Sequence, residues 1–312
     1  MTSTEMTSTI DTSVAGFGLP ALPTDNKLNR VLTSALREHS VANQPVSVGG
    51  LYWGADYFGL DRVSLFQAAS DLEQQQILAQ LNRGLLQESL SIERAGVGYM
   101  AKMILMASSL QERMLYSLFA ADETTHLAQL QPYAPSVKQA IPDDPFLRLL
   151  SDIVESADKQ ILLFVLQVVL EGWGLSHYRC LAKGCGYGPL RDIFQSFLQA
   201  ESRHHGAGVT LFNQADISAD SRNAIVDCLG TFLQMVRMGP QRVVGAIATT
   251  KGHLSRPQRI QILQQLDTVS HSHQRLQLLR SLMVSSGGSI VNELDNNGLF
   301  TPLTPEEAAS YG

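Results

Sequence analysis

Six side chains of the kinds that bind metal ions occur in this sequence as two copies of one pattern. In each copy a glutamate is followed 30 residues later by a second glutamate, and a histidine comes three residues after that. The copies lie 78 residues apart, so the pattern is far more specific than a lone Glu-x-x-His, which often matches by chance. Four carboxylates and two imidazoles can hold a pair of metal ions. The six residues are Glu93, Glu123, His126, Glu171, Glu201 and His204.

Antiparallel helices would bring these six side chains to one level. Residues i and i+3 share a helix face, so the glutamate and histidine of each Glu-x-x-His motif point the same way. A break at Ser108–Ser109 lies midway between Glu93 and Glu123, about 23 Å from each along a helix. In the second copy, Gly184–Pro189 supplies a helix stop and a helix start at the corresponding place. Two helical hairpins are therefore predicted.

The surroundings of the glutamates favour a buried metal site. Apolar residues flank each of them, and several converging buried carboxylates would not be stable without compensating cations. Glu123 and Glu201 are expected to bridge two metals, because each shares a helical turn with a histidine; the upstream glutamates would be terminal ligands. Mixed carboxylate and imidazole donors favour iron or manganese. The alternative is a set of surface acids or hydrogen-bonded core acids.

The pattern resembles the ferritin-like di-iron carboxylate superfamily over roughly residues 64–213. Asp122-Glu123-Thr-Thr-His126 is similar to the Asp-Glu-x-x-His form of its oxygen-activating members, and Glu201-Ser-Arg-His204 to the Glu-x-Arg-His form of desaturases and hydroxylases. The resemblance implies a four-helix bundle with a long crossover, two iron ions (manganese being the alternative) and O2 as co-substrate. It also implies an external electron donor and a small or carrier-bound organic substrate.

Departures from the family patterns narrow the chemistry. Leu130 stands where the small subunits of ribonucleotide reductase carry a radical tyrosine, which argues against a stored tyrosyl radical. Phe197 stands where arylamine N-oxygenases carry a third histidine, which weakens that assignment. An oxygenase or oxidase is expected, acting by hydroxylation, desaturation, N-oxygenation or oxidative C–C cleavage. The alternatives are an iron-handling ferroxidase and a scaffold that has lost its chemistry.

Three further residues are candidates for catalytic roles. Asp122 is expected to orient His204 from across the bundle, whereas its counterpart in the second copy, Ala200, cannot do the same for the other histidine. Tyr116 and Tyr178 each lie seven residues from a ligand glutamate, about 10 Å along the helix axis. They are candidates to line a substrate channel or relay electrons; filling the core with a hydrogen-bonded hydroxyl is the alternative.

Two glycines and two histidines lie close to the ligands in sequence. Gly96 and Gly174 each follow an upstream glutamate by three residues, on the inner helix face. Helices usually avoid glycine, so the pair indicates either open space beside the metals or close helix packing. His177 and His205 are expected to be structural.

Composition describes a protein with ample apolar content for a large core. Hydrophobic residues make up 44% of the 312 residues. The longest apolar stretch, 161–170, is far shorter than the roughly 20 residues needed to span a bilayer. No signal peptide is evident, and three cysteines form no disulfide framework, so a cytoplasmic protein is expected. No nucleic-acid-binding signature is present. An enzyme of this kind is expected to be a monomer or a homodimer.

Charge is uneven along the chain. Residues 221–290 carry eight lysines and arginines against two aspartates, although the whole chain has a net charge of −6. Such a basic region can dock an acidic carrier, a phosphate-bearing substrate or another subunit. A solvated surface that balances an acidic body is the alternative.

The fold class predicted is all-α, because no stretch alternates apolar and polar residues as a strand would. Three parts are expected: a flexible tail (1–25), a four-helix bundle with an N-terminal helix and loop (26–215), and a C-terminal helical extension packed on it (216–312). The loop over 48–59 is expected to pack on the bundle or, alternatively, to cover a pocket mouth. The helices expected are 26–41, 64–107, 110–131, 146–183 with an interruption at 156–158, 189–213, 219–236, 240–250, 256–283 and a short one beginning at 304.

Overall fold

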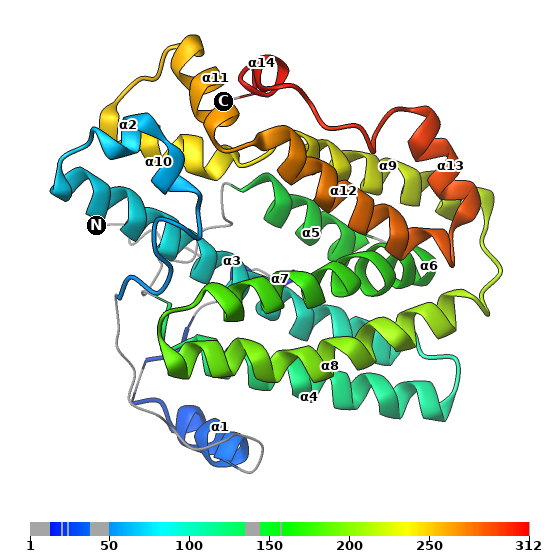
Figure 1. Ribbon diagram of the computed structural model, residues 1–312. Coiled ribbons are helices and arrows are strands. Elements are labelled where there is room, and N and C mark those ends of the chain that lie inside the picture. The colour runs from blue at the N-terminus through cyan, green and yellow to red at the C-terminus, as the bar shows by residue number, and fades with distance from the viewer. Residues whose placement is uncertain are drawn as a thin grey trace, which may run out of the picture.

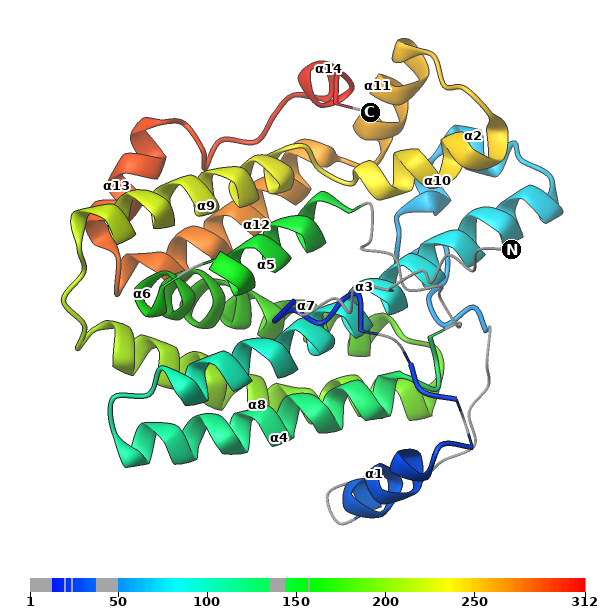
Figure 2. The same ribbon diagram turned by 180° about the vertical axis from the view of Figure 1, so that it is seen from behind.

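The protein is all-helical in a computed structural model. The structure describes residues 13–19, 21–23, 25–37, 50–134, 144–156 and 158–311. Over these ranges every regular element is a helix and no strand occurs, as the sequence predicted. Figures 1 and 2 show long helices running side by side in one half of the molecule and a set of shorter helices covering them.

The first predicted hairpin is formed by α3 (Asp71–Leu105) and α4 (Leu110–Leu130), which pack against each other. A capping box between Ser70 and Glu73 starts α3, and Ser109 caps α4 by accepting a hydrogen bond from the Glu112 amide. The bend between the helices therefore lies where the sequence placed it.

The second hairpin pairs a long composite helix with α8 (Gly188–Phe212). The composite helix contains α6 (Lys159–Ile161), a π-helical stretch, η2 (Leu162–Leu170), and α7 (Glu171–Gly184). A π-helical stretch shifts the register of the residues after it and is often found at functional sites. Here it ends immediately before Glu171, so it sets the direction of a predicted ligand.

The interruption predicted at 156–158 is present. Helix α5 (Pro145–Ser156) ends there, and Asp158 caps the next helix by accepting hydrogen bonds from the amides of Gln160 and Ile161. The crossover between the hairpins includes residues 135–143, which lie outside the described ranges. Helix α4 also packs against α8, so the two hairpins lie side by side (Figure 1).

The C-terminal extension shares its core with the long helices. Helix α9 packs on α5 and on η2, α10 on α3, and α12 on α7. Val165 and Val168 of η2 belong to the same buried cluster as Leu229 of α9 and Leu279 of α12. The extension thus covers the long helices and is joined to them by one apolar core. Its helices are α9 (Ala219–Arg237), α10 (Gln241–Lys251), α11 (Arg256–Gln265), α12 (Thr268–Val284), α13 (Gly288–Asn296) and α14 (Pro305–Ala308).

Two expectations for this extension were wrong. The single helix predicted over 256–283 is broken into α11 and α12 at Asp267, whose backbone is left-handed with φ of 49°. No helix was predicted over 284–303, but α13 forms there and its apolar residues Ile290, Val291 and Leu294 are buried. Their spacing gives a narrow apolar stripe on a short helix, which forms because α9 and α12 cover it.

The N-terminal segment also differs in part from the prediction. Residues 1–12 lie outside the described ranges, but Ala15 and Phe17 are buried in the core and the Ala15 amide donates to Glu155. The prediction of a flexible tail is therefore wrong for this stretch. Helix α1 (Lys27–Arg37) has no buried residue and lies beside α4 at the edge of the molecule (Figure 2).

The loop before α3 packs on the long helices, as expected. It contains η1 (Leu60–Arg62) and leads into α2 (Ser64–Gln67). Trp53 is fully buried and donates its indole N–H to the carbonyl of Leu181. The buried Asn82 of α3 accepts hydrogen bonds through Oδ1 from the backbone amides of Tyr52 and Trp53, at 2.8 and 2.9 Å.

One helix of the described chain, Lys159–Gly184, has the length and composition to cross a membrane. Its most apolar window is 61% buried inside the protein, as is usual for a core helix, so this is weak support for a membrane span.

Asn82→Ala tests how the loop is held. The substitution leaves two buried amides without acceptors, and we expect the free energy of unfolding in urea to fall by about 3 kcal/mol. Asn223→Ala, at an exposed position of α9, is the control and should change it by less than about 0.5 kcal/mol. Equal effects of the two substitutions would contradict this account of the loop.

Candidate metal centre

All six predicted ligands converge at one place inside the four long helices. Their ligand atoms form two groups, and within each group the atoms lie within 4.8 Å of one another. Glu123 and Glu201 belong to both groups, and these are the two carboxylates expected to bridge. The first group is Glu93, Glu123, His126 and Glu201; the second is Glu123, Glu171, Glu201 and His204.

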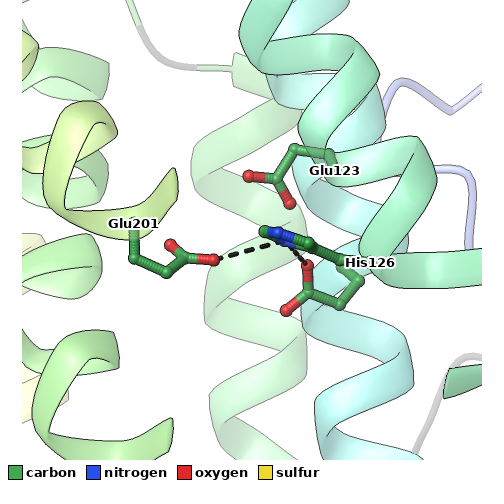
Figure 3. A group of neighbouring side chains, drawn as sticks. Glu123, His126 and Glu201 are labelled. Atoms are coloured by element: carbon green, nitrogen blue, oxygen red, sulfur yellow. Dashed lines mark hydrogen bonds and ion pairs between the residues drawn. The ribbon is translucent and has the colours of Figure 1, made fainter. Parts of the chain in front are cut away.

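The first group gathers around the His126 imidazole. Its Nδ1 lies 3.0 Å from Glu93 Oε2 and 3.4 Å from Glu201 Oε1. Figure 3 shows the Glu201 carboxylate, from α8, directed toward His126 on α4. Because an unmetallated Nδ1 cannot donate to both acids equally, its position between carboxylate oxygens suits a cation better than a proton.

The second group gathers around His204, which is fully buried. Its Nδ1 lies 3.1 Å from Glu123 Oε1 and 3.9 Å from Glu171 Oε2. The directions are poor for hydrogen bonding, so this nitrogen has no hydrogen-bond partner in the described part of the chain. A buried ring nitrogen directed at carboxylates without a hydrogen bond is what a metal-ligating imidazole requires.

The opposite nitrogen of His204 has the partner that the sequence predicted. Nε2 lies 3.3 Å from Asp122 Oδ2, and Arg203 forms an ion pair with the same oxygen at 3.2 Å. Burial would raise the pKa of Asp122, but the contacts with His204 and Arg203 outweigh it and lower that pKa. Asp122 is therefore ionised and fixes which nitrogen of His204 faces the centre.

The carboxylates repel one another in the absence of a cation. Burial, and then the charge of Glu93, raises the pKa of Glu123 well above its ordinary value. Burial and the neighbouring Glu171 do the same to Glu201. Burial would also raise the pKa of Glu171, but its interactions with Glu201 and His204 outweigh burial and lower that pKa. Two shared acids that resist ionisation mark the place where positive charge is needed.

His204 takes part of that charge when no metal is bound. Burial would lower the pKa of His204, but the surrounding carboxylates of Asp122, Glu123 and Glu171 outweigh it and raise the pKa to about 12. A metal at this position would replace that proton, because a ligating imidazole must be neutral.

Two phenylalanines related by the repeat cover the two imidazoles. The Phe197 ring stacks on His126 with centroids 3.9 Å apart, and the Phe119 ring packs on His204 at 4.3 Å. Both phenylalanines are buried. They hold the imidazole planes and exclude water from the cluster.

The two candidate tyrosines have different positions. The Tyr178 hydroxyl donates directly to Glu93 Oε1. In the described part of the chain no hydrogen bond joins Tyr116 to a ligand side chain; its hydroxyl donates to Gln167 Oε1 at 2.7 Å, and Gln167 Nε2 donates to the backbone carbonyl of His204 at 3.1 Å. Of the two tyrosines, Tyr178 therefore hydrogen-bonds to the cluster, whereas Tyr116 supports the helix that carries His204.

Sequence reasoning gave Gln167 no role in the site. It is fully buried within the π-helical stretch and links Tyr116 to α8. The available signal was a single polar residue inside the longest apolar run of the chain, which a packed core tolerates only with hydrogen-bond partners.

The paired glycines have different surroundings. A Cβ on Gly96 would lie 2.3 Å from Glu123 Oε2, so this glycine allows a bridging carboxylate to approach α3. A Cβ on Gly174 would meet no heavy atom within 4 Å. Of the two explanations for a glycine at these positions, close packing applies to Gly96 and open space applies to Gly174.

The remaining candidates lie outside the cluster. His205 directs Nδ1 toward the carbonyl of Gln167, at 3.3 Å, in keeping with a structural role. His177 lies near Glu88, with Nε2 3.8 Å from Oε1. Cys180, Cys185 and Cys228 are free thiols.

A polar surface pocket between α4 and α8 borders the first metal group. His126 lines it, together with Asp122 and Arg203. Because 7% of the His126 side chain is exposed, against none for His204, the two imidazoles differ in their contact with solvent.

The arrangement fits a pair of divalent cations. Four carboxylates carry four negative charges, which two divalent ions would balance while both imidazoles remain neutral. The donor set is oxygen-rich with one nitrogen for each metal, which suits iron or manganese. No family model, curated protein or solved structure matches this chain.

Gly96→Ala and Gly174→Ala form a matched test of the cluster. The added methyl at position 96 displaces the Glu123 carboxylate, so we expect metal bound per chain to fall to half or less. At position 174 the methyl has space, so binding should be retained and stability should rise by up to about 1 kcal/mol. Metal analysis after loading and desalting measures both, and equal retention would contradict the role given to Gly96.

The raised pKa values predict how metal and pH act together. Glu123 and Glu201 bind protons more tightly in the folded chain, so their stabilising contribution is present below their ordinary pKa of 4.5 and lost as pH rises through the higher folded values. His204 acts in the same direction, from 6.5 toward about 12. We expect the melting temperature of the metal-free protein to decrease as the pH is raised from about 5 to 8. The rise in melting temperature that added metal causes should become larger over the same pH range.

The double substitution Glu123→Gln with Glu201→Gln is the control for this experiment. Glutamine cannot titrate, so the fall with pH should be smaller and the metal effect should disappear. Identical pH profiles for this variant and the wild type would rule out the linkage.

Proposed function

We propose that this protein is an O2-dependent non-haem di-iron oxidoreductase whose four long helices form a ferritin-like bundle. Its substrate would be a small or carrier-borne organic molecule, oxidised by hydroxylation, desaturation, N-oxygenation or C–C cleavage. The observation that carries the proposal is a pair of buried ligand groups that share two carboxylates, Glu123 and Glu201. Shared carboxylates are the means by which a protein holds two metals side by side.

Each metal would be held by one glutamate of its own, one histidine and the two shared carboxylates. One would take Glu93 and His126, the other Glu171 and His204, and the shared carboxylates would complete both sets. Iron is favoured over zinc because the set is rich in carboxylates, with manganese as the alternative. When bound, such a pair supplies redox chemistry toward O2 that no side chain can perform.

The chain's own residues would orient the ligands and keep the centre dry. Asp122 accepts from His204 Nε2 and so leaves the Nδ1 lone pair free for the metal. Tyr178 donates to Glu93 and can fix which oxygen of that carboxylate faces inward. Phe119 and Phe197 close the cluster on the two imidazole faces. Electrons would come from an external donor or from the substrate.

Anaerobic loading with Fe(II) tests the proposal directly. We expect about two iron ions per chain, because two ligand groups are present. Glu123→Ala removes a shared ligand and should abolish binding at both positions, and His204→Ala should lose at least one iron. Exposure of loaded wild type to O2 should consume the gas and change the absorption spectrum.

Glu112→Gln is the control for general damage. Glu112 is a buried acid that pairs with Lys159 at 2.5 Å and belongs to neither ligand group, so this variant should keep about two irons. Absence of iron in the wild type would end the proposal. A large cage-like assembly on size-exclusion chromatography would favour iron storage instead, whereas a monomer or dimer agrees with an enzyme.

A further inference from the structure

The basic segment 221–290 is largely neutralised by the protein itself. Lys251 pairs with Glu73 of α3, and Arg242 pairs with Glu88 of α3 and with Asp144. Two of the eight basic residues therefore attach the extension to the long helices, and two more pair with acids of the extension itself, which argues against a broad basic docking face. Arg275 apart, every basic residue of this segment has an interaction partner: Arg222, Arg237, Arg242, Lys251, Arg256, Arg259 and Arg280.

Arg275 of α12 is different. It forms no hydrogen bond or ion pair within the described ranges of the chain and is exposed to solvent. Yet the surrounding protein lowers its pKa by desolvation, and its electrostatic neighbours are Tyr57, Glu88 and Cys180. A guanidinium that water reaches, but that protein surrounds on several sides, is available to an anionic ligand.

A line of residues on α7 runs from the metal cluster toward this arginine. Glu171, Gly174 and His177 succeed one another at three-residue intervals, which form a ridge along a helix. The pKa of His177 responds to Arg275 and Arg242 as well as to Glu88, so this imidazole lies among those groups. The ridge thus connects a metal ligand with the free guanidinium.

The repeat supplies an internal comparison for this ridge. In the first copy the corresponding residues are closed off: the Glu93 side chain is 1% exposed, the space at Gly96 is filled by Glu123, and Tyr99 is buried. In the second copy the Glu171 side chain is 15% exposed and Gly174 faces open space. Besides the surface pocket that His126 lines, the second copy therefore gives solvent a separate approach to the cluster, at Glu171.

His177 adds an unused polar atom to the open side. Its Nε2 is buried and has no hydrogen-bond partner among the described residues, since Glu88 at 3.8 Å is too distant. Burial is the main cause that lowers the pKa of His177, so the ring is neutral near pH 7. It can donate to, or accept from, a ligand that lies along the ridge.

We propose that Arg275 binds the carboxylate of the organic substrate, whose apolar body lies along Gly174 and His177 with its far end at Glu171. This inference deepens the proposed function and rests on it. A monoanion is favoured over a phosphate because one free arginine stands beside the acidic Glu88, which would repel a dianion. Six residues separate Glu171 from His177, so the substrate body spans about 9 Å.

Binding of simple carboxylates tests the subsite. Octanoate and 4-propylbenzoate, each compared with the corresponding primary alcohol, would be titrated by calorimetry into anaerobic Fe(II)-loaded protein. We expect at least one carboxylate to bind more tightly than its alcohol. Arg275→Gln should weaken binding of the carboxylate by about 10-fold or more, because it removes a charge-assisted hydrogen bond, and should leave binding of the alcohol unchanged.

Arg280→Gln is the matched control on the same helix. Arg280 is paired with Asp295, so its loss should change carboxylate binding by less than about twofold. Equal weakening by the two substitutions would overturn the proposal. So would failure of every carboxylate to bind up to its solubility limit, or tighter binding of octyl phosphate than of octanoate.

Gly174→Leu separates the path from the anion site. The larger side chain fills the open space, so we expect octanoate binding to be lost while iron content and the melting temperature remain close to those of the wild type. Undiminished octanoate binding in this variant would show that the ligand does not lie along α7.

Iron content and O2 consumption are measured on the same preparations. If the protein holds two irons per chain and consumes O2 but binds no carboxylate, the proposed subsite is wrong and the proposed function still stands. Absence of iron would remove the proposed function itself.

Discussion

Mutual repulsion among four buried carboxylates is the constraint on which this structure depends. Glu93, Glu123 and Glu201 are almost entirely buried, and their oxygens lie within a few ångströms of one another. Placing such charges in an apolar interior costs several kcal/mol for each ion unless opposite charge is supplied. Without metal the protein supplies protons, and the raised pKa values of Glu123 and Glu201 express that cost. The long helices therefore hold an arrangement that is unfavourable unless positive charge compensates it.

The repeat explains how one short pattern builds this scaffold, and its exceptions explain why the two halves differ. Phe119 and Phe197 preserve the symmetry by covering the histidine of the other copy. Asp122 supports His204, whereas Ala200 at the equivalent position offers His126 nothing, so the imidazoles are oriented by different means. Tyr178 binds Glu93, but its counterpart, Met100, has no group to donate to Glu171. Each half therefore has one ligand that a neighbouring side chain holds, Glu93 in the first copy and His204 in the second, and one that is more exposed, His126 or Glu171.

The sequence predicted the hairpins and the convergence of the six side chains well because both depend on local rules. Helical spacing fixes which side chains share a face, and capping residues fix where α3 and α4 begin. It failed where long-range packing decides. The break at Asp267 occurs inside a continuous helical pattern, and Phe17 was assigned to a tail because nothing nearby shows that α3 and α5 leave space for it. Gln167 is a similar case, since its partners lie 51 and 37 residues away.

The C-terminal extension affects which sides of the cluster are accessible from outside the protein. A bundle that only had to bind metals would not need helices over η2 and α7, because the ligands are already enclosed by the four long helices. The extension seals the apolar stretch of η2 with Leu229, Leu279 and their neighbours, so that approach from that side is closed. At α7, however, it presents the exposed Arg275 and not an apolar side chain, with Glu88 and Cys180 among its electrostatic neighbours. Under the proposed function, a cover that is sealed over η2 and polar at α7 would favour a charged, elongated substrate.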